Sequence, residues 1–145
     1  MLKVMIAPVT PFQQNCSIAW CDETMEGTAV DPGGDFDMLK EAIAQQGIKV
    51  TKVLLTHGHV VFVNRPAKVA FVGDVLFRGS IGRTDFPRGN HEQLLNSIRK
   101  RLWPLGDDIT FVPGHGQTST FGWERKTNSF VADLLFDDDE EEAKA

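Results

Sequence analysis

Four side chains of types that bind metal ions each stand just after a short apolar segment of the chain. His57 and His59 follow one such segment, Asp74 follows a second and His115 follows a third. Apolar segments of this length, bounded by Gly and Pro, indicate buried β-strands. A sheet can present polar residues from several strand ends at one shared edge, so we expect these four side chains to meet there.

The order of the expected elements indicates a mixed α/β (α+β) fold. Asp35 is expected to cap a first helix that Gly47 ends, and Asn90 to cap a second. The strand at 48–55 is largely apolar and is expected to be buried on at least one face. We predict strands at 2–7, 15–20, 28–31, 48–55, 60–63, 69–72 and 109–112, helices at 35–47, 91–103 and 120–126, and a long loop at 78–89.

The 145 residues suit one domain, which we place at residues 1–136. The formal net charge is −5, but residues 137–142 are all acidic, so the remainder is close to neutral. Such a block repels itself, and we expect 137–145 to be a disordered tail. The sequence shows no basic face, no membrane-spanning segment and no signal peptide, so we expect no nucleic-acid partner, no membrane association and a cytoplasmic location.

The two cysteines, Cys16 and Cys21, stand five residues apart in one expected strand. This odd spacing places them on opposite faces, where they cannot form a disulfide with each other. We therefore expect two free thiols, one of them buried.

A His-x-His pair in extended backbone places two imidazoles on one side, so His57 and His59 can both reach one ion. A carboxylate such as Asp74 can bridge two ions or complete a tetrahedron, and zinc held in this way supplies hydroxide near neutral pH. His91 follows a helix cap, where exposed polar residues are common, so no ligand role is expected for it.

The loop at 78–89 contains Gly82-Arg83-Thr84-Asp85. We expect the guanidinium of Arg83 and the carboxylate of Asp85 to pair and to order this loop. The alternative is a role facing the substrate.

Six stretches, in this order, resemble glyoxalase II-like (hydroxyacylglutathione hydrolase-like) bacterial members of the metallo-β-lactamase superfamily. They cover nearly the whole chain outside the acidic tail. The stretches are PVTPFQQNCSIAWC at 8–21, AVDPGGD at 29–35, LLTHGH at 54–59, FVGDVLFRGSIGRTDFPRGN at 71–90, FVPGHG at 111–116 and STFGWERKTNSF at 119–130.

The resemblance implies an αββα sandwich with a two-metal site at the sheet edge. The family signature is Thr-His-x-His-x-Asp-His, followed by a third His, a bridging Asp and a last His. His57 and His59 match the start of the signature, Asp74 matches the bridging Asp, and His115 matches the last His. The resemblance thus implies His57, His59, Asp74 and His115 as metal ligands, with Asp74 and His57 also catalytic.

The chain departs from the signature at two ligand positions, where it has Val61 and Phe62. The family has a helix and several strands here, which indicates an internal deletion with its junction near 58–60. His59 corresponds to the second ligand, to the third, or to both. We expect an incomplete sandwich that holds at most one zinc ion well, where the family holds one or two. The deletion should also expose an apolar patch that favours homo-oligomers.

Three interpretations remain open. The first is a zinc-dependent hydrolase of a thioester such as S-2-hydroxyacylglutathione, impaired by the deletion, in which metal-bound hydroxide attacks the carbonyl. The second is an iron protein similar to persulfide dioxygenases, with two His and one Asp around the iron. The third is a catalytically inert deletion product.

Overall fold

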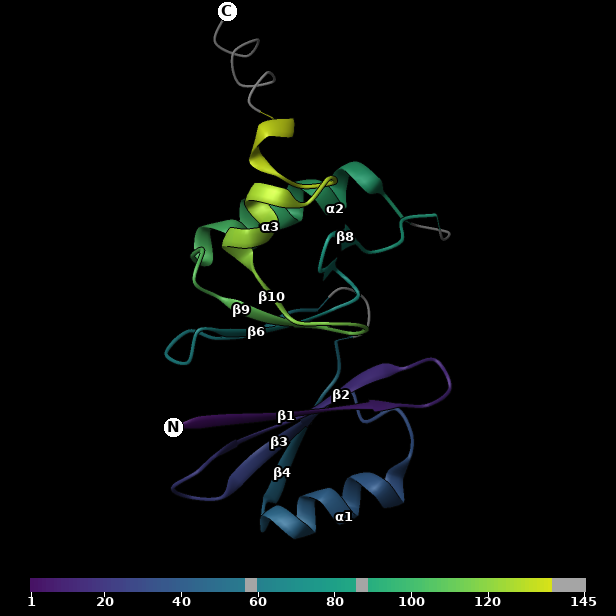
Figure 1. The fold of residues 1–145 in the computed structure, drawn as a ribbon, viewed down its shortest axis with the longest axis vertical. Helices are drawn as coiled ribbons and strands as arrows, with labels where there is room; N and C mark the ends of the chain where they lie inside the picture. The colour runs from purple at the N-terminus through teal and green to yellow at the C-terminus, as the bar shows by residue number, and fades with distance from the viewer. Residues whose placement is uncertain (57–59, 86–88, 137–145) are drawn as a thin grey trace, which may run out of the picture.

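The computed structural model describes residues 1–56, 60–85 and 89–136, and these form two four-stranded sheets with helices on their outer faces. Figure 1 shows α1 outside the N-terminal sheet, and α2 and α3 on the far side of the C-terminal sheet. The expected order of helix, sheet, sheet and helix is therefore confirmed. The expected tail at 137–145 lies outside the described residues.

The N-terminal sheet has the order β1-β2-β3-β4. Its first three strands are antiparallel, and β4 runs parallel to β3 because α1 connects the two. The expected strands in this half are confirmed to within a few residues. The strands are β1 (Leu2–Val9), β2 (Gln14–Cys21), β3 (Glu26–Val30) and β4 (Lys49–Leu54).

The C-terminal sheet has the order β10-β9-β6-β5, and its central strands β6 and β9 are parallel. The expected long loop is wrong in part, because a two-stranded hairpin, β7–β8, lies in and just before it. Each strand of the hairpin has only two residues, which is too short for the alternation of apolar and polar residues that identifies a strand in a sequence. The strands are β5 (Phe62–Asn64), β6 (Val69–Gly73), β7 (Leu76–Phe77), β8 (Ser80–Ile81), β9 (Thr110–Pro113) and β10 (Ser119–Thr120).

Helix α1 (Phe36–Gln46) lies where the sequence predicts it, and Gly47 ends it in the left-handed conformation. Asp35 does occupy the N-cap position, but its side chain makes no capping hydrogen bond. Instead its Oδ2 atom accepts a hydrogen bond of 2.8 Å from the backbone N–H of Thr10. The position of the cap is therefore predicted correctly, but its contact is not. The Asp35 carboxylate binds the β1–β2 turn instead of the first turn of the helix.

The second predicted helix is continuous but changes its winding. Asn90 caps it by accepting a 3.0 Å hydrogen bond from the N–H of Gln93, as expected. Thr120 caps α3 in the same way through Trp123. The segments are α2 (His91–Ser97), a π-helical turn (Ile98–Leu102), a 3₁₀ turn (Trp103–Leu105), α3 (Phe121–Thr127) and a final 3₁₀ turn (Asp133–Leu135).

Buried apolar side chains fill three layers of the sandwich. The largest lies between the C-terminal sheet and its helices, and includes Phe111, Phe121 and Ile98. A second lies between α1 and the N-terminal sheet. A thinner layer, which includes Val30 and Phe71, joins the two sheets face to face. The sheets are therefore held together mainly by apolar burial.

Strand β4 corrects one expectation about burial. No residue of β4 is fully buried, although we expected at least one covered face; only Val50 and Leu54 are half-buried against the neighbouring apolar layers. The side chain of Val53 is 58% exposed and that of Leu55, just after the strand, is 55% exposed. The cause is position: among the described residues β4 is the edge of its sheet, with a neighbour on one side only.

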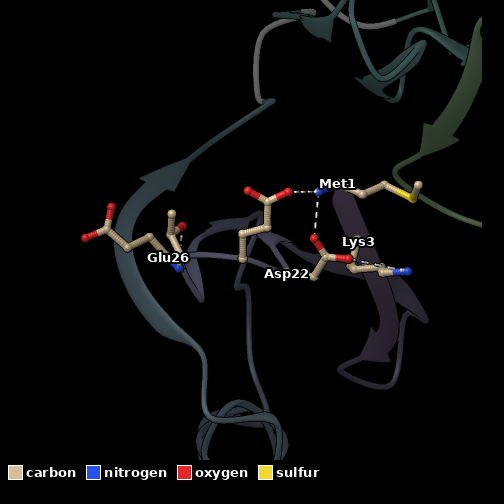
Figure 2. A network of polar contacts seen from close by, with 6 residues as sticks. Met1, Lys3, Asp22 and Glu26 are labelled. Atoms are coloured by element: carbon tan, nitrogen blue, oxygen red, sulfur yellow. Dashed lines mark hydrogen bonds and ion pairs between the residues drawn. The ribbon is translucent and has the colours of Figure 1, made fainter.

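A network of charges closes the start of β1 against the end of β2 (Figure 2). The ammonium group of Met1 donates a 2.6 Å hydrogen bond to Oδ1 of Asp22, and Lys3 lies 3.8 Å from the same carboxylate. The Met1 ammonium lowers the pKa of Asp22 from its ordinary value, and the pKa of the ammonium is raised in turn.

The cysteines behave as expected: both are free, Cys16 is buried and Cys21 is half-buried. Desolvation by burial, with a smaller contribution from Asp31, raises the pKa of Cys16 to about 11. Within the described ranges, no helix is long and apolar enough to cross a bilayer.

Candidate functional site

Asp74 and His115 lie side by side at the carboxyl end of the C-terminal sheet. Asp74 directly follows β6, and His115 comes two residues after β9. Because these strands are parallel neighbours, their ends meet at the same edge. Nδ1 of His115 lies 3.0 Å from Oδ1 of Asp74, and both side chains are exposed to solvent. The sequence prediction that these two residues converge is borne out geometrically.

An irregularity in the β6–β9 ladder sets how the two residues face each other. Phe71 pairs with Val112, but Gly73 pairs with Pro113, so β6 carries one residue more than β9 over this stretch. Such a bulge bends the strand and redirects the side chains that follow it.

Two glycines give the Asp74 carboxylate and backbone the room they need. A Cβ atom on Gly114 would overlap Oδ1 of Asp74, and a Cβ atom on Gly82 would overlap its backbone oxygen. Both separations would be shorter than real non-bonded contacts. A side chain at Gly114 would displace the Asp74 carboxylate, and one at Gly82 would displace the Asp74 backbone.

Asn15 fastens the loop that carries His115 to the N-terminal sheet. Its backbone N–H donates a 2.6 Å hydrogen bond to the oxygen of Gly114. Its side-chain Nδ2 donates to the oxygens of Pro113 at 3.0 Å and Gly116 at 2.9 Å. Asn15 is buried, and its side-chain bond to Pro113 forms out of contact with water. The loop is thus held from both sides of the sandwich.

A buried pair, Asp31 and Thr56, closes the end of the N-terminal sheet. Oδ1 of Asp31 accepts a 2.7 Å hydrogen bond from the Thr56 N–H, and Oδ2 accepts one from the Thr56 hydroxyl. Thr56 also packs against Gly73, which leaves no room for a side chain there. The residue before His57 therefore touches the residue before Asp74, so the two segments of the chain converge.

The chain matches the profile of the metallo-beta-lactamase superfamily over residues 58–115. It is also 31% identical to the hydroxyacylglutathione hydrolase GloC of Haemophilus influenzae, with 90% of this chain and 98% of that protein covered. The chain belongs to the metallo-beta-lactamase superfamily. It is accordingly a metallo-hydrolase by family.

The fold agrees with solved structures of this superfamily. The structure superposes on that of ETHE1 from Myxococcus xanthus with a TM-score of 0.82 at 18% identity, covering 90% of this chain and 84% of that one. It superposes on TTHA1623 in a di-iron-bound form with a TM-score of 0.79 at 22% identity, covering 88% and 100%. At these identities the likeness shows the fold.

The alignment with GloC also bears on the size of the chain. It runs over 209 positions and covers 98% of that metallo-beta-lactamase relative, although this chain has only 145 residues. The relative therefore has many residues without a counterpart here. A junction near 58–60 remains our prediction.

His57 and His59, the other two ligands implied by the superfamily resemblance, lie outside the described residues. Among residues 1–56, 60–85 and 89–136, no group of three or more His, Cys, Asp or Glu side chains is close enough to hold a metal ion. Of the four ligands that the resemblance implies, the described residues bring Asp74 and His115 together. His91 lies exposed at the start of α2.

The expected pairing of Arg83 with Asp85 is confirmed. Two hydrogen bonds, of 3.0 and 2.8 Å, join the guanidinium to the two carboxylate oxygens. Arg83 lowers the pKa of Asp85 and has its own pKa raised by the same contact. Both side chains are exposed, so the pair shapes the loop locally and adds little stability.

A groove of about 510 Å³ opens between the two sheets and is separate from the site. Neither Asp74 nor His115 lines it. Its walls come from the strands of both sheets, including the edge strands, through Trp20, Lys52, Leu54, Phe62 and Phe71 among others.

Sequence reasoning missed the residues that support the site: Asn15, Asp31 and Gly114 took no part in the predicted chemistry. One signal could have pointed to Asn15 and Asp31, because both stand at an end of an expected apolar strand. A polar side chain at such a position, when buried, needs a hydrogen-bond partner from another segment.

Proposed function

We propose that this chain derives from a metal-dependent hydrolase of the glyoxalase II type, which cleaves a thioester such as S-2-hydroxyacylglutathione. Its activity is impaired by the shortened segment near 58–60. The observation that carries the proposal is the contact of Asp74 with His115 at the carboxyl edge of two parallel strands. Similarity to GloC over 98% of that protein supports the substrate class.

The donor groups at this edge fit a divalent metal ion. Imidazole nitrogen and carboxylate oxygen are the donors that zinc and non-haem iron take. We propose that His57 and His59 complete the set with Asp74 and His115. When bound, the metal would polarise the thioester carbonyl and lower the pKa of a water molecule toward neutrality.

The residues of the chain provide positions and orientations for this chemistry. The Asp74 carboxylate faces Nδ1 of His115 and restrains the imidazole ring. Asn15 fixes the loop of His115 from the opposite sheet, and Asp31 fixes the segment that leads into His57. A site held on strand ends in this way keeps its geometry before a ligand arrives.

An iron protein similar to persulfide dioxygenases is the second candidate. A facial triad needs two imidazoles and one carboxylate, which His57, His115 and Asp74 can supply. Asp74 and His115 already form two of these three donors in one contact. In this case one iron ion per chain is expected.

A catalytically inert deletion product is the third candidate. The exposed edge strand β4 and the many positions of GloC without a counterpart here favour it. In this case the purified chain would hold no stoichiometric metal.

Metal content and activity separate the three candidates. We would purify the 145-residue chain, measure zinc and iron by elemental analysis, and assay hydrolysis of S-D-lactoylglutathione with GloC as the positive control. The proposal expects about one zinc per chain and slow hydrolysis, both lost in Asp74→Asn and His115→Ala. His91→Ala, which changes an exposed histidine on α2, should leave both unchanged.

Other outcomes contradict the proposal. About one iron per chain with oxygen uptake on a glutathione persulfide would favour the dioxygenase. No metal and no turnover in a folded chain would favour the inert product.

A further inference from the structure

Glu124 is a fully buried carboxylate that has no part in the chemistry described above. It lies on α3 and its side chain is 0% exposed. A buried charged group is costly unless several donors satisfy it, so its place in a core needs a structural reason. Three neutral groups donate to it: the backbone N–H of Gly79, the hydroxyl of Ser119 and the amide of Asn128.

The two oxygens of Glu124 hold two different segments of the chain. Oε2 accepts a 2.9 Å hydrogen bond from Gly79, five residues after Asp74. Oε1 accepts a 2.6 Å hydrogen bond from Ser119, four residues after His115. One carboxylate therefore joins the segment that leaves Asp74 to the segment that leaves His115.

Asn128 strengthens the first of these links. Its Nδ2 atom donates to Oε2 of Glu124 at 2.8 Å and to the backbone oxygen of Ser80 at 3.1 Å. Glu124 and Asn128 together hold the N–H of Gly79 and the oxygen of Ser80, at the tip of the β7–β8 hairpin. Both side chains are completely buried, so water does not compete for the bond between Asn128 and Glu124.

The hairpin that is held in this way touches both site residues. The ring of Phe77, on β7, lies 6.4 Å from the ring of His115, measured between centroids. Gly82, just past β8, packs against the backbone of Asp74. Arg78 at the hairpin tip also donates a 3.0 Å hydrogen bond to Gln117, in the loop after His115. A displaced hairpin would therefore move the surroundings of both Asp74 and His115.

We propose that Glu124 is a positioning residue for the Asp74–His115 pair. It sets their relative placement by fixing the hairpin with one oxygen and the β10 segment with the other. The inference concerns the same site as the proposed function, but it holds for the metal-free chain. It can therefore stand or fall independently of catalysis.

The test compares three variants of the full chain without metal. Glu124→Ala removes both links, Ser119→Ala removes only the link on the His115 side, and Glu124→Gln keeps the shape. In Glu124→Gln the amide oxygen can accept from Gly79 and Asn128, while the amide nitrogen donates to the Ser119 hydroxyl, which can also accept. Glu92→Ala, an exposed glutamate on α2, is the control.

The main measurement is the ¹H–¹⁵N correlation spectrum of the His115 imidazole and of the amides of Asp74 and Gly79. We expect Glu124→Ala to shift the signals of both site residues, Ser119→Ala to shift mainly those of His115, and Glu124→Gln to restore the wild-type spectrum. Zinc titration should follow the same order, with affinity on the order of tenfold lower in Glu124→Ala.

The proposal fails if Glu124→Ala lowers the thermal unfolding midpoint but leaves the signals of Asp74 and His115 in place. It also fails if Glu124→Gln shifts them as much as alanine does. If Glu124→Ala does not fold, Ser119→Ala decides, and an unchanged His115 signal would overturn the proposal. Absence of zinc binding in every variant would count against the proposed function and leave the spectral comparison valid.

Discussion

The carboxylate of Asp31 accepts two hydrogen bonds from Thr56, one from its backbone N–H and one from its hydroxyl. Both residues are buried, and Asp31 takes the left-handed backbone conformation with φ 52°. The pair joins the end of β3 to the segment that follows β4. It therefore fixes the direction in which the chain leaves the N-terminal sheet.

Asp31→Ala should destabilise the chain. It leaves the N–H and hydroxyl of Thr56 buried without their partner, which costs about 1–3 kcal/mol for each group. Asn tolerates the left-handed conformation and keeps one acceptor oxygen, so Asp31→Asn should cost less. Urea unfolding measures both. Equal stability of Asp31→Ala and the unmodified chain would contradict this account of the pair.

Gly114→Ala should disrupt the site with little change elsewhere. Its Cβ atom would overlap Oδ1 of Asp74, the atom that faces His115, so the carboxylate must shift. We expect a changed imidazole signal for His115 in ¹H–¹⁵N spectra and weaker zinc binding. Gly116→Ala is the matched control: its left-handed conformation costs about 1–2 kcal/mol, but open space surrounds the added methyl. A crystal structure of Gly114→Ala with an unmoved Asp74 would refute the prediction.

The two thiols should differ in reactivity. Cys21 is half-buried, and hydrogen bonds from the backbone of Thr24 and Glu23 lower its pKa, so it should react with a thiol reagent in the native chain. Cys16 is buried with a pKa of about 11 and should react only after unfolding. Rapid labelling of two thiols at pH 8 without denaturant would contradict this.

The raised pKa of Cys16 also predicts alkaline destabilisation. Above pH 9 the unfolded chain loses the thiol proton while the folded chain keeps it, so stability falls as the pH rises toward 11. The slope approaches about 1.4 kcal/mol per pH unit from this group. In Cys16→Ala this slope should be absent, which urea unfolding at pH 8, 9 and 10 can test.

The exposed side chains of Val53 and Leu55 should bind hydrophobic probes. The double variant Val53→Thr/Leu55→Thr should reduce fluorescence of the dye ANS and light scattering, with stability changed by no more than about 0.5 kcal/mol per site. Val30→Thr is the control for the same type of substitution at a buried site. Because Val30 is buried, the added hydroxyl there should lower the free energy of unfolding by about 1–3 kcal/mol. Homo-oligomer formation remains a prediction, and unchanged scattering in the double variant would argue against this patch as its cause.

The sequence predicted the parts of the fold that local signals control. Gly47 and Asn90 marked helix boundaries because their preferences act within one turn of the backbone. The pair of Asp74 and His115 was predictable because each follows an apolar strand. Their contact needed only that the two strands be parallel neighbours.

The remainder depended on distant contacts that no local pattern contains. The exposure of β4 follows from the lack of a lateral neighbour in the described sheet, and an apolar run looks the same with or without one. Glu124 looked like an ordinary helix glutamate, because its burial depends on Gly79 and Ser119, far away in sequence. The placement of His57 and His59 remains a prediction.

The extra residue in β6 has a consequence for how the carboxylate and the imidazole are spaced. With an even ladder after Phe71 and Val112, the partner of Asp74 would be His115 itself. The bulge advances β6 by one position, so the register after the Gly73–Pro113 pair brings Asp74 opposite Gly114, which has no side chain to overlap the carboxylate. The number of residues in β6 relative to β9 therefore sets the separation of the carboxylate and the imidazole. A slip of β6 by one residue against β9 after Val112 would place Asp74 opposite His115, even with both residues still in the sequence.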